Sequence, residues 1–130
     1  MTVESEIYDR LTEVSGLTDL VSTRISQGLR LQDEANPGVS FFFTSRLPFP
    51  AMSATAAIRQ ARMQVDSYAD DLTGAQAVAK QVAAALDRHK DATGIADIRL
   101  IAERDLTELE DLDELQYRIT QEYMVDYTEV

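Results

Sequence analysis

The first apolar pattern in the chain has helical spacing. Between residues 3 and 14, apolar side chains recur every three or four positions, at Val3, Ile7, Leu11 and Val14. This spacing places them on one side of an α-helix, and the acidic residues near its start are stabilised by the positive helix end. Ser15-Gly16 ends the predicted helix, and residues 17–21 add one short turn before a short strand at residues 24–29.

A second helix is predicted to begin at Thr73. The segment Thr73-Gly74-Ala75-Gln76 matches a capping box, in which the threonine hydroxyl bonds a backbone amide three residues on and the glutamine reaches back. An apolar stripe follows at helical spacing and comprises Ala75, Val78, Ala79, Val82 and Leu86. Gly94 lies just beyond the expected end of this helix.

Four further segments have the alternation or the composition of β-strands: residues 39–45, 62–69, 95–105 and 115–127. In residues 62–69, one side carries Met63, Val65, Ser67 and Ala69. In residues 95–105, the side expected to face the core carries Ala96, Ile98, Leu100 and Ala102. Residues 115–127 form the longest alternating stretch, and Gln121 interrupts its apolar side.

The predicted order is helix, strand, strand, strand, helix, strand, strand, without the strict βαβ alternation of a parallel sheet. We therefore expect an α+β fold, with a mainly antiparallel sheet of about five strands and two main helices packed on one face. The 130 residues suit one core, so residues 1–130 are expected to form a single domain.

The strand at residues 39–45 contains three successive phenylalanines, Phe41, Phe42 and Phe43, which point to alternating faces. Two prolines then exclude a central strand and make residues 46–55 a long connection with several apolar side chains. Such a connection either folds back on the core or presents an apolar surface to another chain, and the sequence leaves both open. The candidate interface comprises Phe41, Phe42, Phe43, Leu47, Phe49 and Met52.

The chain carries a net charge of −11 and no cysteine. The acidic balance disfavours binding to nucleic-acid phosphates, and the lack of cysteine excludes disulfides and thiolate chemistry. No apolar run approaches the roughly 18 residues that a membrane-spanning helix needs, and the acidic first residues differ from the basic start of a signal peptide. We expect no membrane association, and a chain that stays in the compartment where it is made.

The single histidine, His89, is expected in the last turn of the second helix, where positive groups complement the negative helix end. No nucleophile or second ligand can be paired with it from the sequence. No glycine-rich phosphate loop, nucleophile elbow or HExxH helix occurs either. We therefore expect no enzymatic activity, no cofactor and no metal.

Carboxylates are dense between residues 103 and 114, but the glycine and the Asp/Asn spacing of an EF-hand loop are missing. We predict a solvated acidic connection between two strands, from Leu106 to Glu114. The alternative is an acidic rim that attracts a basic partner. Its candidate residues are Glu108, Glu110, Asp111, Asp113 and Glu114.

Several segments, together with the order of elements, resemble one known family. They are residues 17–25, the strand at residues 62–69, residues 83–87, Glu103-Arg104-Asp105 and the strand starting at Tyr117-Arg118-Ile119. The chain resembles the tail-completion, or tail-terminator, family of long-tailed bacteriophages over nearly its whole length. The long connection at residues 48–57 and the acidic stretch at residues 106–114 depart from the simplest family pattern.

The resemblance implies a structural protein of the head–tail joint, or neck. It would add to the end of a finished tail tube, stop polymerisation and join the tail to a head-side connector or stopper protein. It implies a homo-oligomer, commonly a hexameric ring, through which DNA passes without specific binding. It also implies a place in the virion tail or neck, and in the host cytoplasm during assembly. The candidate interface would then meet sister subunits, and the acidic rim another partner.

Two other functions are compatible with the residues. One is a small ligand-binding domain or enzyme with a pocket between sheet and helices, lined by Tyr68, Tyr117, Tyr123 and Arg118. The other is an acidic mimic of DNA, which requires carboxylates spaced along one face.

Overall fold

The computed structural model describes residues 3–22, 24–28, 37–47, 58–90, 95–110 and 114–128. They form three helices and five strands in the order α1 (Val3–Glu13), α2 (Ser15–Val21), β1 (Ile25–Gln27), β2 (Gly38–Leu47), β3 (Ile58–Ala69), α3 (Leu72–Leu86), β4 (Ile95–Glu110) and β5 (Glu114–Thr128). The predicted order is confirmed. The short turn expected at residues 17–21 is a separate helix, α2.

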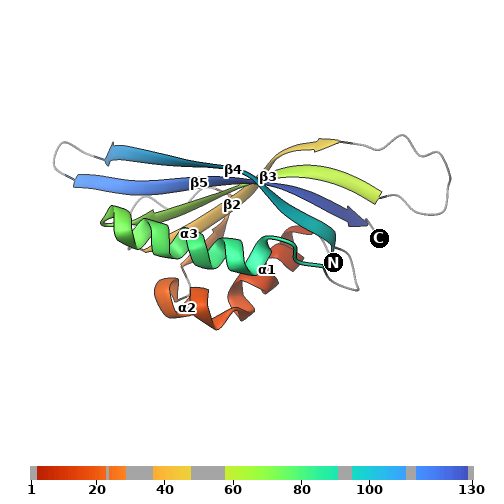
Figure 1. Ribbon diagram of the computed structural model, residues 1–130, viewed down its shortest axis with the longest axis horizontal. Coiled ribbons are helices and arrows are strands. Elements are labelled where there is room, and N and C mark those ends of the chain that lie inside the picture. The colour runs from red at the N-terminus through yellow and green to blue at the C-terminus, as the bar shows by residue number, and fades with distance from the viewer. Residues whose placement is uncertain are drawn as a thin grey trace.

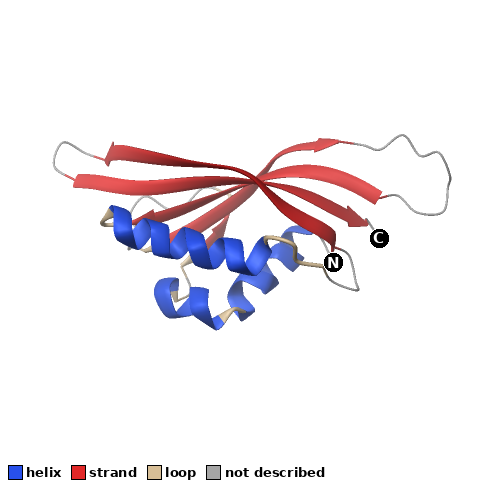
Figure 2. Cartoon of the chain, in the orientation of Figure 1, coloured by secondary structure: helices blue, strands red, loops and turns tan. Residues whose placement is uncertain are grey.

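The strands form one sheet in the order β1-β2-β3-β5-β4. β1 pairs with β2 in parallel over three residues, and the other neighbours are antiparallel. All three helices lie on the same side of this twisted sheet (Figures 1 and 2). The expected α+β class, with helices on one face of a mainly antiparallel sheet, is therefore confirmed. Among the residues that the structure describes, no helix lies over the other face of the sheet.

The hydrophobic core lies between the sheet and the helices. α1 contributes Ile7 and Leu11, α3 contributes Val82, and the sheet contributes Val65 and Tyr123, all fully buried. These residues lie at the helical and alternating positions that the sequence pattern predicts. Each large apolar side chain buried in this way contributes roughly 1.5–3 kcal/mol. An ion pair between Glu4 of α1 and Arg46 of β2 also joins the helical layer to the sheet.

β4 departs from the predicted alternation. The expected core set was Ala96, Ile98, Leu100 and Ala102, but the pairing with β5 shifts between Ile95 and Asp97 and again between Leu100 and Ala102. Each shift adds a residue on one strand only, as in a β-bulge, and exchanges the faces of the residues beyond it. Ile98 is buried and Leu100 packs on the core, whereas Ala102 pairs opposite Glu122, on the other face.

The acidic stretch is strand for most of its length. The sequence predicts a loop from Leu106 to Glu114, but β4 continues to Glu110, and Leu106 to Glu110 pair in register with Arg118 to Glu114. The prediction was wrong because a charged composition indicates only that a segment contacts solvent. A two-stranded ladder also contacts solvent, so the composition does not distinguish it from a loop. The ladder extends past the last residue of β3, Ala69, which pairs with Tyr117.

α3 begins with a different cap from the one predicted. Asp71, not Thr73, is the N-cap: its backbone is extended, and its carboxylate Oδ1 accepts a hydrogen bond from the Gly74 amide at 2.6 Å. A carboxylate in this position also interacts favourably with the positive end of the helix. After α3, the backbone amide of Leu100 donates to the Asp87 carboxylate at 3.0 Å, which ties the helix end to β4.

Candidate interface on the open face of the sheet

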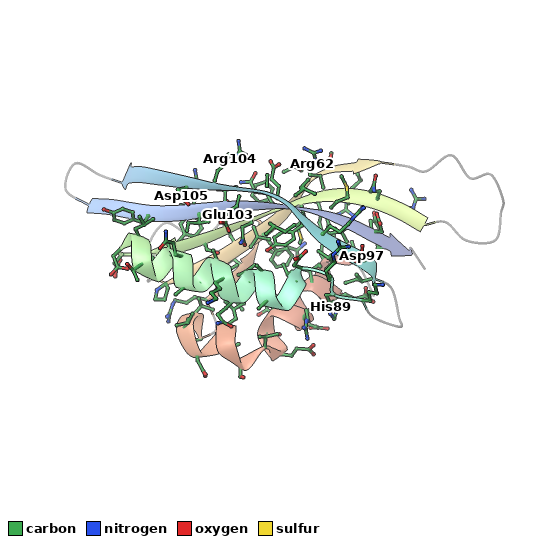
Figure 3. The ribbon with its side chains drawn as sticks, viewed as in Figure 1. Arg62, His89, Asp97, Glu103, Arg104 and Asp105 are labelled. Carbon is green, nitrogen blue, oxygen red and sulfur yellow. The ribbon has the colours of Figure 1, made fainter. Side chains whose placement is uncertain are left out.

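The face of the sheet without helices is called here the open face. On β3 it carries the residues that alternate with the buried set, namely Arg62, Gln64, Asp66 and Tyr68. On β5 their partners in register are Met124, Glu122, Thr120 and Arg118. Figure 3 shows Arg62 and Arg104 pointing away from the helices on this side. The open face therefore combines arginines, carboxylates and uncharged polar groups.

Asp66 is the centre of this face, and it is only 3% exposed. Its carboxylate accepts hydrogen bonds from the Thr120 hydroxyl at 2.8 Å, the Gln64 amide at 3.1 Å and the Tyr68 hydroxyl at 3.4 Å. Nη1 of Arg118 lies 3.9 Å from Oδ2, the carboxylate oxygen that also accepts from Tyr68. A buried carboxylate is tolerated because these donors replace its hydration. The residues thus form a fixed polar floor in the middle of the open face.

Beside this floor, two arginines share one carboxylate. Arg104 of β4 lies 3.2 Å from Glu122, and Arg62 of β3 lies 3.9 Å from its other oxygen. The side chains of Arg62 and Arg104 are 48% and 60% exposed, whereas that of Glu122 is 21% exposed. The guanidinium groups therefore lie outermost, and the carboxylate lies beneath them.

Farther along β5 the numbers are reversed, and one arginine lies between two carboxylates. Arg99 donates to Asp126 at 3.4 Å and lies 3.7 Å from Asp97, and its side chain is more exposed than either carboxylate. The Gln60 amide donates to Asp126 at 3.1 Å. Exposed ion pairs of this kind contribute only about 0–1 kcal/mol to stability. Their main effect is on the chemical character of the surface.

Apolar groups lie among these charges. Phe42, Met124 and Ala102 are half-buried, and Ile101, the extra residue at the second shift of β4, is 45% exposed. Of the three phenylalanines, Phe42 belongs to the open face. Phe41 is fully buried in the core on the helix side, so it offers no surface to another chain. Phe43 also packs against the core, partly buried, and its ring lies 4.7 Å from the Arg46 guanidinium carbon.

The other predicted interface residues are less fully described. Leu47 lies in the backbone of β2, and Phe49 and Met52 lie outside the described residues. For the acidic rim, Glu108, Glu110 and Glu114 lie in strand backbone, whereas Asp111 and Asp113 lie outside the described residues. The role of both sets stays a prediction.

The helix side of the sheet contains a buried polar network at Gln121. Its amide donates to the Ala79 carbonyl at 3.1 Å and to Glu103 at 2.8 Å, and its oxygen accepts from the Tyr123 hydroxyl at 3.0 Å. Burial, with Asp87 and Glu103 nearby, raises the pKa of Tyr123 far above its ordinary value. The hydroxyl therefore stays protonated as a hydrogen-bond donor.

An open groove of about 350 Å³ lies beside this network, between α3 and the β4–β5 ladder. Its polar lining includes Gln76, Lys80, Glu103 and Asp105, and Figure 3 shows the latter two on the helix side of the sheet. No group of three or more potential metal ligands occurs among the residues that the structure describes. In the described part of the chain, no helix is long and apolar enough to cross a membrane.

The four residues predicted to line a ligand pocket do not converge. Tyr68 and Arg118 belong to the open face, around Asp66. Tyr117 packs against the alanines of α3 on the opposite face, and Tyr123 is fully buried in the core. The predicted pocket therefore has no counterpart at these positions. His89 follows α3 rather than lying in its last turn, and its backbone amide donates to the Leu86 carbonyl at 3.0 Å.

Sequence inspection missed the exposed arginines of the open face. The alternation in residues 62–69 places Arg62 on the solvent side, but it does not show which strands flank it. Arg104 belongs to this face only because of the second shift in β4. The only signal in the sequence for these arginines was the composition, because ten of the twelve cationic residues are arginines.

One comparison with known proteins shows the family of this chain, and another shows the fold. Residues 5–127 match the profile of the family described as tail completion protein gp17. The fold is similar to that of a chain in the virion of a native gene transfer agent particle, with a TM-score of 0.72 and 17% sequence identity over 98% of this chain and 95% of that chain. No curated protein matches. Because the family match spans nearly the whole chain, the protein belongs to the tail completion protein gp17 family.

Proposed function

We propose that this chain caps the end of a tail tube, stops its polymerisation and joins the tail to the head-side connector or stopper protein as a ring. The observation that carries the proposal is the family match over residues 5–127. This match supports a structural role in tail assembly, and the finer steps are inferred from that role. The protein would then reside in the tail or neck of the virion, after assembly in the host cytoplasm.

A ring is compatible with the surfaces of the chain. A closed ring with one repeated contact needs two different complementary patches on each subunit. The helical layer and the open face are two such chemically different surfaces, on opposite sides of the sheet (Figure 2). We propose six copies, as in the predicted hexamer. Six chains of net charge −11 would carry roughly −66, which disfavours adhesion of DNA passing through the ring.

The predicted contact residues enter this proposal with one change. Phe41 is excluded because its side chain is buried within its own subunit. Phe42, Phe43, Leu47, Phe49 and Met52 stay as proposed contacts between sister subunits. The rim of Glu108, Glu110, Asp111, Asp113 and Glu114 stays as the proposed contact with another partner.

The test is a tube-capping assay. The tail-tube protein encoded by the same genome is allowed to polymerise with and without the purified chain, and tube lengths are measured by negative-stain microscopy. Tubes should stop growing in the presence of the chain, with extra density at one end, whereas an unrelated acidic protein should have no effect. Unchanged tube lengths together with bare tube ends would refute the proposal.

A further inference from the structure

The charges of the open face differ from those of the rest of the chain. Its described residues include four arginines, Arg62, Arg99, Arg104 and Arg118, and four carboxylates, Asp66, Asp97, Glu122 and Asp126, which pair with them. Among the residues whose side chains the structure describes, this face is therefore balanced, although the whole chain has a net charge of −11.

An approaching partner would meet the guanidinium groups first. Arg104 and Arg62 are more than twice as exposed as the Glu122 carboxylate that they share. The guanidinium group presents several donors in a plane and binds carboxylates in a fixed geometry. The open face is therefore suited to an acidic partner, even though it has no net positive charge.

The open face carries several residues of the types that are enriched in protein interfaces. Arginine, phenylalanine, tyrosine and methionine are enriched in such interfaces, and lysine is depleted. Phe42, Tyr68 and Met124 lie among the arginines, and both lysines of the chain are elsewhere, at Lys80 on α3 and at Lys90. A nucleic-acid site would need unneutralised cations, and here each arginine has a carboxylate beside it.

The outer side of α1 and α2 has the complementary composition. Its exposed residues include three carboxylates, Asp9, Glu13 and Asp19, and two apolar side chains, Tyr8 and Leu20. The last two are 39% and 37% exposed, which places them among the few exposed large hydrophobic residues that the structure describes. We call this set the outer helical surface.

We propose that the open face docks onto the outer helical surface of a second copy of the chain. This inference rests on the proposed ring and names the surfaces that form it. Two copies of net charge −11 repel each other, so a contact that places arginines against carboxylates is favoured over one that does not. Among the described surfaces, the open face can accept an acidic neighbour without adding uncompensated like charge. Because the two surfaces differ, the contact is head-to-tail and can repeat around a ring.

The test is a charge swap measured by light scattering after size exclusion. One variant carries Arg62→Glu and Arg104→Glu, and the other carries Asp9→Arg and Asp19→Arg. Each variant alone should be monomeric, because like charges then face each other across the contact. An equimolar mixture should recover the oligomer, because each variant supplies the surface that the other needs. Rising salt should weaken the wild-type oligomer.

Two further variants control for charge and for folding. Lys80→Glu with Lys90→Glu changes the net charge by as much as the first swap, at exposed positions off both surfaces, and should keep the oligomer. Arg62→Gln with Arg104→Gln avoids adding carboxylates beside Glu122 and should weaken association at least about tenfold, a loss of roughly 1.4 kcal/mol. Circular dichroism checks that every variant is folded.

The possible failures are distinguishable. If wild type and both swap variants form the same oligomer, or if the mixture is not rescued, the assignment of surfaces is wrong and the ring stands. If the Arg62→Glu and Arg104→Glu variant keeps the oligomer but no longer caps tubes, the open face binds the tube and the inference is overturned. If wild type stays monomeric at high concentration, both the inference and the ring are overturned.

Discussion

Replacing Gln121 by leucine tests whether the buried polar network, rather than apolar burial, stabilises this part of the core. Gln121 is 1% exposed and interrupts an otherwise apolar alternation along β5. By hydrophobic pattern alone, Gln121→Leu completes the core and should be stabilising. By hydrogen-bond accounting it should be destabilising, because the buried Tyr123 hydroxyl loses its acceptor at 3.0 Å.

The expected magnitude follows from which partners can be replaced by water. Glu103 is exposed, so water can replace the amide that it loses. Tyr123 is fully buried, and leaving its hydroxyl without an acceptor costs about 1–3 kcal/mol. The greater hydrophobicity of leucine offsets part of this cost. We therefore expect Gln121→Leu to lower the free energy of unfolding by about 1–2 kcal/mol, which corresponds to a fall in Tm of roughly 3–10 °C.

The assay is a double-mutant cycle with Tyr123→Phe. The phenylalanine variant alone should cost about 1 kcal/mol, because it leaves the Gln121 oxygen without this donor. The double variant should cost less than the sum of the two single variants, since neither partner then remains unsatisfied. Unfolding by urea, at one fixed protein concentration, gives all three values.

Two results would refute this account. If Gln121→Leu is as stable as wild type or more stable, apolar burial dominates at this position. If the losses of the two single variants are simply additive, the hydrogen bond between Tyr123 and Gln121 contributes nothing beyond the separate side chains.

Three further changes test separate features. Asp71→Ala should lower the free energy of unfolding by about 1 kcal/mol and Thr73→Ala by less than about 0.5 kcal/mol, because Asp71 is the N-cap; equal losses in urea would contradict this. Asp66→Ala should cost about 2–3 kcal/mol in thermal unfolding, because the buried Thr120 hydroxyl loses its acceptor; a neutral result would disprove the polar floor. Since the pKa of Tyr123 is raised, the unfolded chain releases this proton first. Tyr123 should therefore leave the free energy of unfolding unchanged below about pH 10 and lower it above about pH 10 by up to about 1.4 kcal/mol per pH unit. Tyr123→Phe should reduce this fall.

Periodicity predicted the elements because burial on one side imposes it. Residues 62–69 alternate on a strand whose helix-facing side is buried from Ala61 to Ala69, so the pattern and the structure agree at Met63 and Val65. The stripe of α3 agrees for the same reason. A pattern within one segment could not predict the shifts in β4, because a bulge depends on how two strands pair. Ala102 was therefore assigned to the wrong face.

The candidate interface was harder to predict than the fold. The sequence showed that the three successive phenylalanines alternate between faces, but it did not show that Phe41 lies in the core and Phe42 on the open face. The exposed pair Arg62 and Arg104 comes from strands separated by β5, so only the order of strands in the sheet brings them to one carboxylate. The composition shows that the chain is rich in arginine, but it does not show that two arginines lie beside one carboxylate.

The two faces of the sheet therefore require different measurements. On the helix side, the role of a residue is read from the free energy of unfolding, because its partners lie within the same chain. On the open face, Arg62 and Arg104 share one carboxylate in exposed ion pairs, which contribute about 0–1 kcal/mol each, so folding alone gives little reason for two arginines at this position. A variant at these positions that unfolds like wild type and yet fails to associate assigns them to assembly. A variant that loses stability in proportion to its loss of association assigns them to the fold.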